Sequence, residues 1–461
     1  MNALFIIAGI GVLTLVAEIV NLKRFLTAFA ALGLIAALAF LPLFQNHQQS
    51  SQAFNNMLVF DGSAVAFTWL IVIVSVLWLW MSAGYLREGT HQTDKTSLVI
   101  FVVLGAVIMS SFNNMAMLFL GLEILSLSLY ALAGSRKDSL SSIEAAFKYF
   151  LMGSFATGFL LFGITLVYGA TRSFDLQEIF EVIGNSEGTM PGYFYAGILL
   201  MMVGLAFKIS AVPFHFWAPD VYEGSPTAIT SLMATVVKIA AFAAFWRIFG
   251  STFALAGGNW TKVIVGLVIL TLVIPNITAI YQQKVKRMLA YSSIAHVGYI
   301  LLGFVGAMDL QSVKPLFIIL YLGAYAVSSL AAFSVLMKVE ANGGSFNGLY
   351  YRNPMLAVTM IFALMSMAGL PPLAGFAGKY LVFIMAMRGS HTILVLLAVA
   401  TSLVSVYYYF RVIIAMFNRQ SEITPVTVSL GDRAFHLLLI VLILGIGLFP
   451  SIPFLAGIIG F

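Results

Sequence analysis

The sequence predicts an all-α polytopic membrane protein with about fourteen transmembrane helices. Of its 461 residues, 61% are hydrophobic and only 9% are charged, whereas an ordinary globular chain carries about 25% charged residues. Mean hydropathy is +1.02, and apolar runs of about 20 residues, long enough to cross a bilayer, follow one another with short connections. A soluble multidomain fold is therefore excluded.

The first apolar run is expected to stay in the protein as a transmembrane helix and not to be cleaved as a signal peptide. It has no basic beginning, it contains Glu18, and Lys23, Arg24 and a second apolar run follow it directly. In chain order, the expected segments are 3–22, 25–44, 62–86, 97–112, 114–133, 144–170, 193–217, 226–248, 260–282, 287–307, 314–337, 354–387, 391–417 and 434–457. Residues 174–184 are expected to form a short amphipathic helix at the membrane interface.

Prolines divide the chain into comparable parts. Pro213 interrupts the seventh segment and Pro371-Pro372 the twelfth, and backbone groups freed inside a membrane survive where they line protein or water. Breaks at matching positions indicate two inverted five-helix repeats, segments 4–8 and 9–13, although simple proline kinks are the alternative. The expected division is helices 1–3 in residues 1–96, repeats in 97–248 and 260–417, and a last helix in 434–461.

The distribution of basic residues predicts the orientation. Of 23 Lys and Arg residues, three lie inside apolar segments and fifteen lie in or beside odd-numbered loops. Even-numbered loops hold the other five, which are Arg172, Arg247, Lys262, Lys314 and Arg388. Because Lys and Arg concentrate in cytoplasmic loops, both termini are expected outside. The net charge of +6 is therefore no sign of nucleic-acid binding.

Five ionisable residues lie within the apolar segments: Glu123, Lys208, Lys238, His296 and Lys379. Each costs roughly 2.5–3.5 kcal/mol at the bilayer centre, and such groups usually mark an ion or proton pathway. The structural alternative is that Lys–Glu pairs lock helices together and that the histidine is a satisfied core residue. Three lysines with one glutamate favour the pathway.

Lysine chemistry suits proton transfer better than sodium transport. A lysine amine loses its proton readily when it is buried away from other charges, and it keeps the proton when a carboxylate lies beside it. Hard cations prefer oxygen ligands. The chain has no Cys, which excludes thiolate-ligated iron–sulfur clusters, and it has neither a phosphate-binding GxxxxGK[ST] motif nor a strand-preceded GxGxxG motif.

Three motifs resemble one known family. They are PFHFWAPDVYEGSPT (213–227), KRMLAYSSIAHVGY (286–299) and the GLPPLAGFAGK run that ends at Lys379. They are similar to motifs of the antiporter-like membrane subunits of respiratory complex I, the NADH–quinone oxidoreductase, over most of segments 4–13. The DVYEGSPT sequence and the chain length resemble the N-type of these subunits. The M-type subunit usually has Glu in place of Lys379, and the L-type subunit is longer.

The resemblance implies a proton-translocating subunit in a bacterial inner membrane. It implies that Glu123 pairs with Lys208, that Lys238 passes protons on to Lys379, and that His296 joins this axis. It also implies that this chain holds no cofactor: FMN, iron–sulfur clusters and quinone belong to partner subunits. The expected partners are neighbouring membrane subunits and the lipid bilayer.

The signature loop adds three charged or titratable side chains, His215, Asp220 and Glu223. Loop packing and helix capping are the structural alternative for them. Two related assemblies remain open as alternatives for the whole chain, a multisubunit cation/proton antiporter and a membrane-bound hydrogenase. A stand-alone solute transporter is disfavoured by the dominance of lysine, and a purely structural anchor would leave the buried charges without a purpose.

Overall fold

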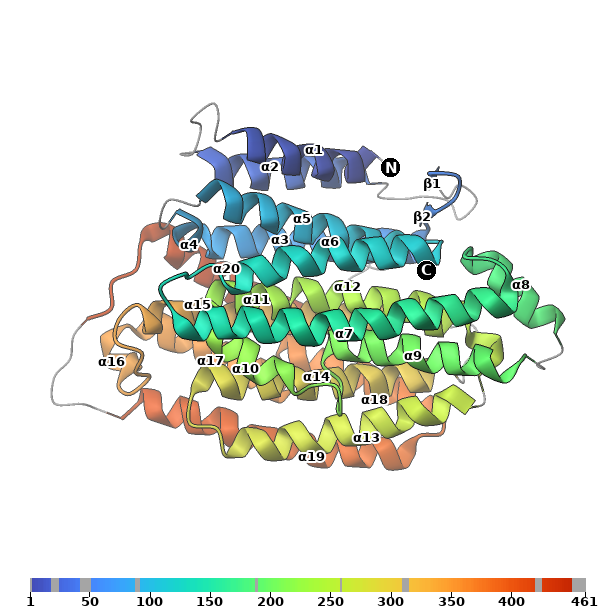
Figure 1. Cartoon of the computed structure of the whole chain (residues 1–461). Helices are drawn as coiled ribbons and strands as arrows, with labels where there is room; N and C mark the ends of the chain where they lie inside the picture. The colour runs from blue at the N-terminus through green and yellow to red at the C-terminus, as the bar shows by residue number, and fades with distance from the viewer. Residues whose placement is uncertain are drawn as a thin grey trace.

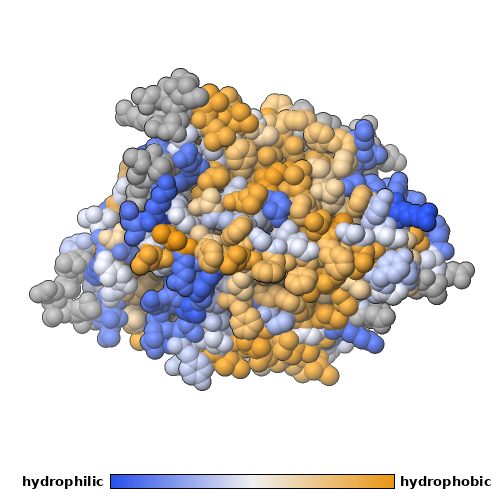
Figure 2. Space-filling view, in the orientation of Figure 1, coloured by the Kyte–Doolittle hydropathy of each residue, from blue (hydrophilic) through white to orange (hydrophobic). Residues whose placement is uncertain are grey.

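The protein is a bundle of helices that lie side by side, as the computed structural model shows (Figure 1). It describes residues 2–17, 25–41, 51–87, 92–186, 190–257, 259–308, 315–418 and 425–449. Within these residues, eleven helices are long and apolar enough to cross a membrane, and three shorter apolar helices accompany them. A broad hydrophobic band runs across the molecule between two hydrophilic ends (Figure 2). The predicted fold class is therefore confirmed.

The helices follow the apolar runs of the sequence. In chain order, the described elements are α1 (Asn2–Val16), α2 (Leu26–Ala39), β1 (Ser51–Ala53), β2 (Leu58–Phe60), α3 (Gly62–Met81), α4 (Ala83–Arg87), α5 (Gln92–Ser111), α6 (Met115–Ala133), α7 (Leu140–Thr171), α8 (Leu176–Asn185), α9 (Gly192–Ile209), α10 (Trp217–Gly224), α11 (Thr227–Ala234), α12 (Val236–Phe245), the π-helical turn η2 (Trp246–Thr252), the 3-10 turn η3 (Ala254–Ala256), α13 (Asn259–Ile280), α14 (Val285–Met308), α15 (Leu316–Glu340), α16 (Leu349–Arg352), α17 (Pro354–Ala368), α18 (Ala374–Arg388), α19 (Thr392–Met416) and α20 (Leu430–Leu448).

Several parts of the sequence prediction are not tested by the structure. They are the count of fourteen spans, the inverted repeats and the division of the chain at 1–96, 97–248, 260–417 and 434–461. Glu18 and the predicted helix end at 450–457 lie outside the described residues. The expected amphipathic segment is helical as α8, and Asp175 caps it by accepting hydrogen bonds from the amides of Gln177 and Glu178.

Helix ends are set by short polar side chains, as expected where backbone amides have no helical partner. Asp61 caps α3 by accepting a hydrogen bond from the Ala64 amide at 2.7 Å. Ser139 caps α7, which therefore begins at Leu140, four residues before the predicted segment. With 32 residues, α7 is about 48 Å long and exceeds the thickness of a bilayer core.

Three interruptions divide long apolar segments. The first separates α9 from α10 and contains Ser210, in the left-handed region at φ +64°, and Pro213. Another separates α17 from α18 at Gly369 and Pro371-Pro372. The remaining break separates α11 from α12 at Thr235, where the sequence has no proline and no break was predicted. Each broken segment also carries one buried lysine.

The interior of the bundle is formed by the middle of the chain. The apolar stretch of the α11–α12–η2 segment is fully buried, and those of α14 and α15 are nearly so, whereas less than half of the apolar stretch is buried in α7, α13, α19 and α20. Large apolar side chains such as Phe155, Leu403 and Val441 point outwards from these outer helices. The fold therefore places Lys238 and His296 in the innermost helices, behind an outer layer suited to lipid or to other membrane chains.

Candidate functional site

Lys208 lies at the end of α9, immediately before the first break. Its amine donates hydrogen bonds to the Ser126 hydroxyl at 2.8 Å and to the Tyr149 hydroxyl at 3.3 Å. Only 5% of the residue is exposed. A buried ammonium is tolerated only where such acceptors replace water, so α6 and α7 together hold this amine in place.

Glu123 lies one helical turn before Ser126 on α6 and is half-buried. It interacts electrostatically with Lys208 and with Tyr130. Among the ion pairs of the described residues, however, none joins Glu123 to Lys208, whose amine faces hydroxyls instead. The resemblance implied that Glu123 pairs with Lys208, and in the structure the two charges interact electrostatically without a salt bridge.

Aromatic rings link the Lys208 region to the signature loop. The Tyr149 ring stacks on Trp217 with 4.6 Å between centroids and meets Tyr130 edge-on at 4.8 Å. His215, in the loop before α10, is buried and packs against Phe216. The loop is thus packed around the first break, which agrees with the structural alternative for His215.

Lys238 lies near the start of α12, directly after the unpredicted break. Its amine donates to the carbonyl oxygen of Ser293 at 2.6 Å and to the Ser293 hydroxyl at 2.5 Å. The Tyr325 hydroxyl donates to the same Ser293 hydroxyl at 2.8 Å. Lys238 therefore shares a hydroxyl with α14 and α15, and no carboxylate takes part.

His296 follows Ser293 on α14 by three residues and is 4% exposed. Its Nδ1 lies 2.8 Å from the Tyr321 hydroxyl, and its Nε2 lies 3.4 Å from the Tyr409 hydroxyl. It also interacts electrostatically with both Lys238 and Lys379. The imidazole is consequently placed between the two lysines, with a tyrosine on each ring nitrogen.

Lys379 lies in α18, after the break at Pro371-Pro372. Its amine donates to the Ala368 carbonyl at 2.8 Å and to the Ser402 hydroxyl at 2.7 Å. It also lies 4.7 Å from the centre of the Tyr299 ring, which is within range of a cation–π interaction. The break is part of this arrangement, because the Ala368 carbonyl is free to accept only where α17 ends.

One face of α14 connects these groups. Ser293, His296 and Tyr299 are three residues apart, a spacing that places side chains along one side of a helix. Ser293 contacts Lys238, and Tyr299 contacts Lys379. The five titratable groups predicted from the sequence thus fall into two parts, with Glu123 and Lys208 at α6 and α9, and with Lys238, His296 and Lys379 along α14.

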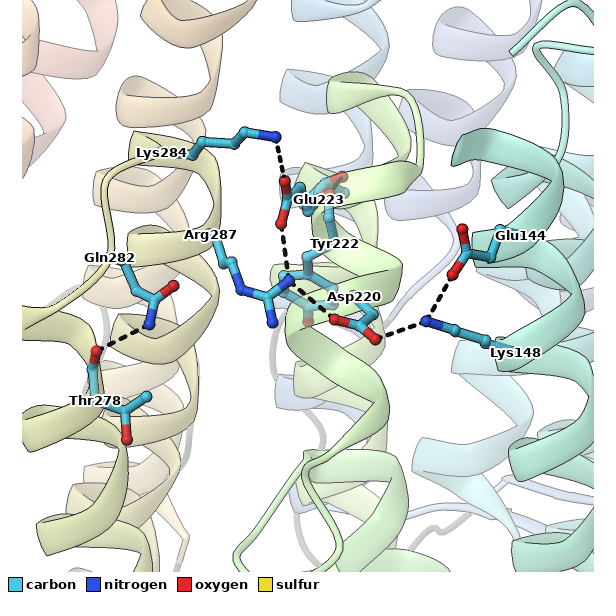
Figure 3. Close-up of polar contacts among 10 residues, drawn as sticks. Glu144, Lys148, Asp220, Tyr222, Glu223, Thr278, Gln282, Lys284 and Arg287 are labelled. Carbon is cyan, nitrogen blue, oxygen red and sulfur yellow. Dashed lines mark hydrogen bonds and ion pairs between the residues drawn. The ribbon is translucent and has the colours of Figure 1, made fainter. Parts of the chain in front are cut away.

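Asp220 and Glu223 form an ion-pair network with three basic side chains (Figure 3). Asp220 contacts Lys148 at 2.8 Å and Arg287 at 2.9 Å. Glu223 contacts Arg287 at 2.8 Å and Lys284 at 2.7 Å. The network therefore joins α7, α10 and α14, which belong to different predicted repeats.

The pKa values of both acids follow from this network. Burial alone would raise the pKa of Asp220, but hydrogen bonds from Lys148 and Arg287 outweigh it and hold the pKa below 3.8. Burial would also raise the pKa of Glu223, but hydrogen bonds from Lys284 and Arg287 keep that pKa below 4.5. Both side chains are charged at neutral pH and serve as structural ties.

At the end of α12, Arg247 in η2 forms a second buried tie. Its guanidinium donates to Asp61 at 2.8 Å and, through Nε, to the Phe112 carbonyl at 2.7 Å. Beside it, Phe245, Phe249 and Phe304 form an aromatic cluster with centroid distances of 4.6 to 5.0 Å. This end of α12 is lined by aromatic rings, in contrast to the hydroxyl-rich surroundings of Lys238.

The sequence reasoning found the charged groups but missed the hydroxyls that hold them. The missed residues are Ser126, Tyr149, Ser293, Tyr299, Tyr321, Tyr325, Ser402 and Tyr409. The regular spacing of polar residues in 286–299 was the available signal. Within the described residues, no group of three or more His, Asp or Glu side chains could hold a metal ion.

Comparisons with known proteins agree with this arrangement. A family model described as "NADH:quinone oxidoreductase/Mrp antiporter, TM" matches residues 112–405. Proteins named NADH-quinone oxidoreductase subunit N from Cytophaga hutchinsonii and Flavobacterium psychrophilum are 41% and 40% identical to this chain. Each alignment covers 98% of this chain and 98% or 99% of the relative.

Solved structures share the whole fold. A chain in the structure of respiratory complex I from Thermus thermophilus with bound aureothin is 35% identical, with a TM-score of 0.83 over 99% of both chains. A chain of the Mrp complex from Dietzia sp. is 20% identical and has a TM-score of 0.81, over 99% of this chain and 95% of that one. The second likeness concerns the fold alone. The resemblance drawn from the three motifs is confirmed, and the chain belongs to the NADH:quinone oxidoreductase/Mrp antiporter family of membrane proteins.

Proposed function

We propose that the chain is a proton-translocating membrane subunit of an NADH–quinone oxidoreductase. Relatives with this subunit's name match over nearly the full length of both proteins. The observation that supports proton transfer most directly is the line of hydroxyls, imidazole and amines along α14 between Lys238 and Lys379. Every member of such a line can donate a hydrogen bond, and all but the charged amines can also accept one.

In this proposal protons reach Lys208, pass through Lys238 and continue to Lys379. Tyr149 and Trp217 connect Lys208 with α10, and Tyr222 of α10 interacts with Ser293 beside Lys238. From Ser293 the line continues through His296 to Tyr299 and Lys379. The aromatic cluster at the end of α12 supports transfer along α14, since the side chains of Phe245 and Phe249 have no group that can donate or accept a proton.

Glu123 is the proposed control on the first lysine. Because it lies near Lys208 without direct contact, a small movement of α6 towards α9 would form an ion pair and hold the amine charged. Moving a proton against 100 mV costs about 2.3 kcal/mol. Forming and breaking a partly buried charge pair covers an energy of this size.

The energy comes from electron transfer in partner subunits. Those subunits would hold FMN, iron–sulfur clusters and quinone, and they would drive this chain through contacts in the membrane. This chain's own donor set does not fit an iron–sulfur cluster, because it contains no Cys. The enzyme activity, as an NADH:quinone oxidoreductase that pumps protons, thus belongs to the assembled complex.

We place the subunit in a bacterial inner membrane with both termini outside. The excess of Lys and Arg in odd-numbered loops supports this orientation, and it puts the Asp220–Arg287 network on the cytoplasmic side. The exposed apolar faces of α7, α13, α19 and α20 would contact lipid and neighbouring membrane subunits, both antiporter-like and small helical ones.

A second candidate is a subunit of a multisubunit cation/proton antiporter or membrane-bound hydrogenase. The family description includes Mrp antiporters, and the Dietzia Mrp chain shares the fold. Full-length relatives at 41% and 40% identity favour the oxidoreductase. The two candidates differ in their driving reaction, because an antiporter exchanges sodium for protons without electron transfer.

The test replaces Lys208 or Lys238 by alanine in the assembled complex. NADH-driven proton pumping in membrane vesicles should be lost in both variants, while the exposed Lys137→Ala variant should pump normally. Full pumping in either buried-lysine variant would contradict the proposal. Sodium-dependent proton movement without NADH would favour the antiporter instead.

A further inference from the structure

A cavity at the Lys284 end of the bundle reaches towards His296. It has a volume of about 690 Å³ and lies between α14, α15, α19 and residues 344–347. Lys284, which is 73% exposed at its side chain, lines the mouth, so the cavity is open to solution. Met288 and Val412 line its inner part and are almost fully buried.

Two hydroxyls lie directly beyond these inner residues. Ser292 follows Met288 by four residues on α14, and Tyr409 precedes Val412 by three residues on α19, so each lies one helical turn deeper. The Ser292 and Tyr409 hydroxyls form a short hydrogen bond with each other. Both residues are fully buried, at 0% and 1% exposure, and neither is among the residues that line the cavity.

The pair continues to the site already described. The Tyr409 hydroxyl lies 3.4 Å from Nε2 of His296, and Nδ1 of His296 lies 2.8 Å from the Tyr321 hydroxyl. Ser292 also precedes Ser293, which accepts from the Lys238 amine. A tyrosine hydroxyl can accept one hydrogen bond and donate another, so Tyr409 links Ser292 to the imidazole.

We propose that the cavity, Ser292 and Tyr409 form a second proton uptake route, which loads His296 while the first route loads Lys208, so that each turnover needs both routes. This inference rests on the proposed function and names a route that the Lys208–Lys238–Lys379 axis does not contain. Tyr409 acts as a positioning and relay residue between the cavity and His296. Asn276, which accepts from the neighbouring Tyr408 at 3.0 Å, helps to fix the α19 helix beside it.

The first test is Tyr409→Phe in the whole complex, in sealed vesicles, with Tyr85→Phe as the matched control. Tyr85 is also a buried tyrosine, and its hydroxyl forms a hydrogen bond with a serine, Ser135, at 2.6 Å. It does not belong to the hydrogen-bonded series Ser292–Tyr409–His296. Proton pumping should fall about tenfold or more in Tyr409→Phe and stay unchanged in Tyr85→Phe. Unchanged pumping in Tyr409→Phe would overturn the route.

The pH profile separates proton delivery from mere packing. When uptake limits turnover, the pumping rate of Tyr409→Phe should fall steeply as the pH on the cavity side rises, because fewer protons are available. A variant that only loosens packing would keep the wild-type profile at a lower level. An unchanged profile in Tyr409→Phe would therefore contradict the relay role even if the rate were reduced.

A second measurement tests whether the cavity admits water as far as its inner end. The chain has no Cys, so single cysteines can be introduced at Ala415 and Val412 in the cavity and at Ile414, which is 66% exposed on the outer face of α19. A membrane-impermeant maleimide applied from the cavity side should label Ala415→Cys and Val412→Cys but not Ile414→Cys. Failure to label Val412→Cys would overturn the route.

The failure of this inference is distinct from failure of the proposed function. If Lys238→Ala abolishes pumping while Tyr409→Phe pumps normally, the function stands and the second route falls. If Lys238→Ala pumps normally, the proposed function itself is wrong.

Discussion

The Lys238 amine is bound by Ser293, through the carbonyl oxygen at 2.6 Å and the hydroxyl at 2.5 Å. These residues lie on different helices, α12 and α14, and both are nearly fully buried. An ammonium group loses much of its hydration in such a place, and hydrogen bonds to a charged group return about 1.5–3 kcal/mol each. The pair therefore decides how readily this lysine carries a proton.

Ser293→Ala should slow proton transfer through Lys238. The substitution removes one of two acceptors and also the partner of the Tyr325 hydroxyl, while the carbonyl remains. With about 1.5–3 kcal/mol lost from the protonated amine, pumping should fall roughly tenfold to a hundredfold. NADH-driven proton uptake by vesicles that contain the assembled complex would measure this change.

Ser75→Ala is the matched control for Ser293→Ala. Ser75 is equally buried, but its hydroxyl donates only to the Ile71 carbonyl of its own helix. Pumping should stay at the wild-type level. Equal losses in the two variants would mean that the effect comes from helix packing and not from Lys238.

Gly369→Ala should displace Lys379. Gly369 has φ +88°, which strains any residue with a Cβ, and a Cβ there would lie 2.8 Å from Cδ of Lys379. The strain costs about 1–3 kcal/mol, so both the melting temperature and proton pumping should fall. Gly158→Ala in α7, where a Cβ meets nothing within 4 Å, should leave pumping unchanged. Normal pumping by Gly369→Ala would show that the Lys379 position is not critical.

The charged part of the site was visible in the sequence because a charge within an apolar run is rare and costly. Lys208, Lys238 and Lys379 stood out for this reason. Their acceptors did not, since serines occur throughout apolar helices: Ser75 and Ser293 look alike in the sequence. Ser75 bonds within its own helix, and Ser293 bonds a lysine 55 positions away. Only tertiary packing separates these cases.

The breaks of the helices were predictable in the same limited way. Proline has no amide hydrogen to donate to the helix, so Pro213 and Pro371-Pro372 predicted two of the interruptions. The third, at Thr235, contains no proline and no glycine. It lies in a segment buried on all sides, where contacts with neighbouring helices decide the backbone path and local propensity has little influence.

Asp220→Asn should weaken the ion-pair network in a pH-dependent way. Because the pKa of Asp220 is lowered in the folded protein, its contribution to stability is present above its ordinary pKa of 3.8 and is lost as the pH falls through the folded value. The contribution is about 1 kcal/mol or less, since the side chain is 37% exposed.

Thermal unfolding of the purified protein in detergent measures this contribution. The difference in melting temperature between wild type and Asp220→Asn should be constant from about pH 6 to pH 8 and should shrink below about pH 4. Added salt should reduce it, because exposed ion pairs are screened. A difference that grows on acidification would contradict the assignment of Asp220 as a charged tie.

Replacement of Arg247 should destabilise the fold. The Arg247 side chain is 9% exposed and binds both the Asp61 carboxylate and the Phe112 carbonyl. Arg247→Met leaves both acceptors without this donor, at a cost of about 2 kcal/mol. Asp61→Asn should cost less, because asparagine still caps α3 through the Ala64 amide and only the charge pair is lost. Thermal unfolding should give Arg247→Met a lower melting temperature than Asp61→Asn. The control Lys262→Met, at an exposed position, should melt at the wild-type temperature. Equal melting temperatures for Arg247→Met and Lys262→Met would show that the Arg247–Asp61 ion pair contributes nothing to the stability of the fold.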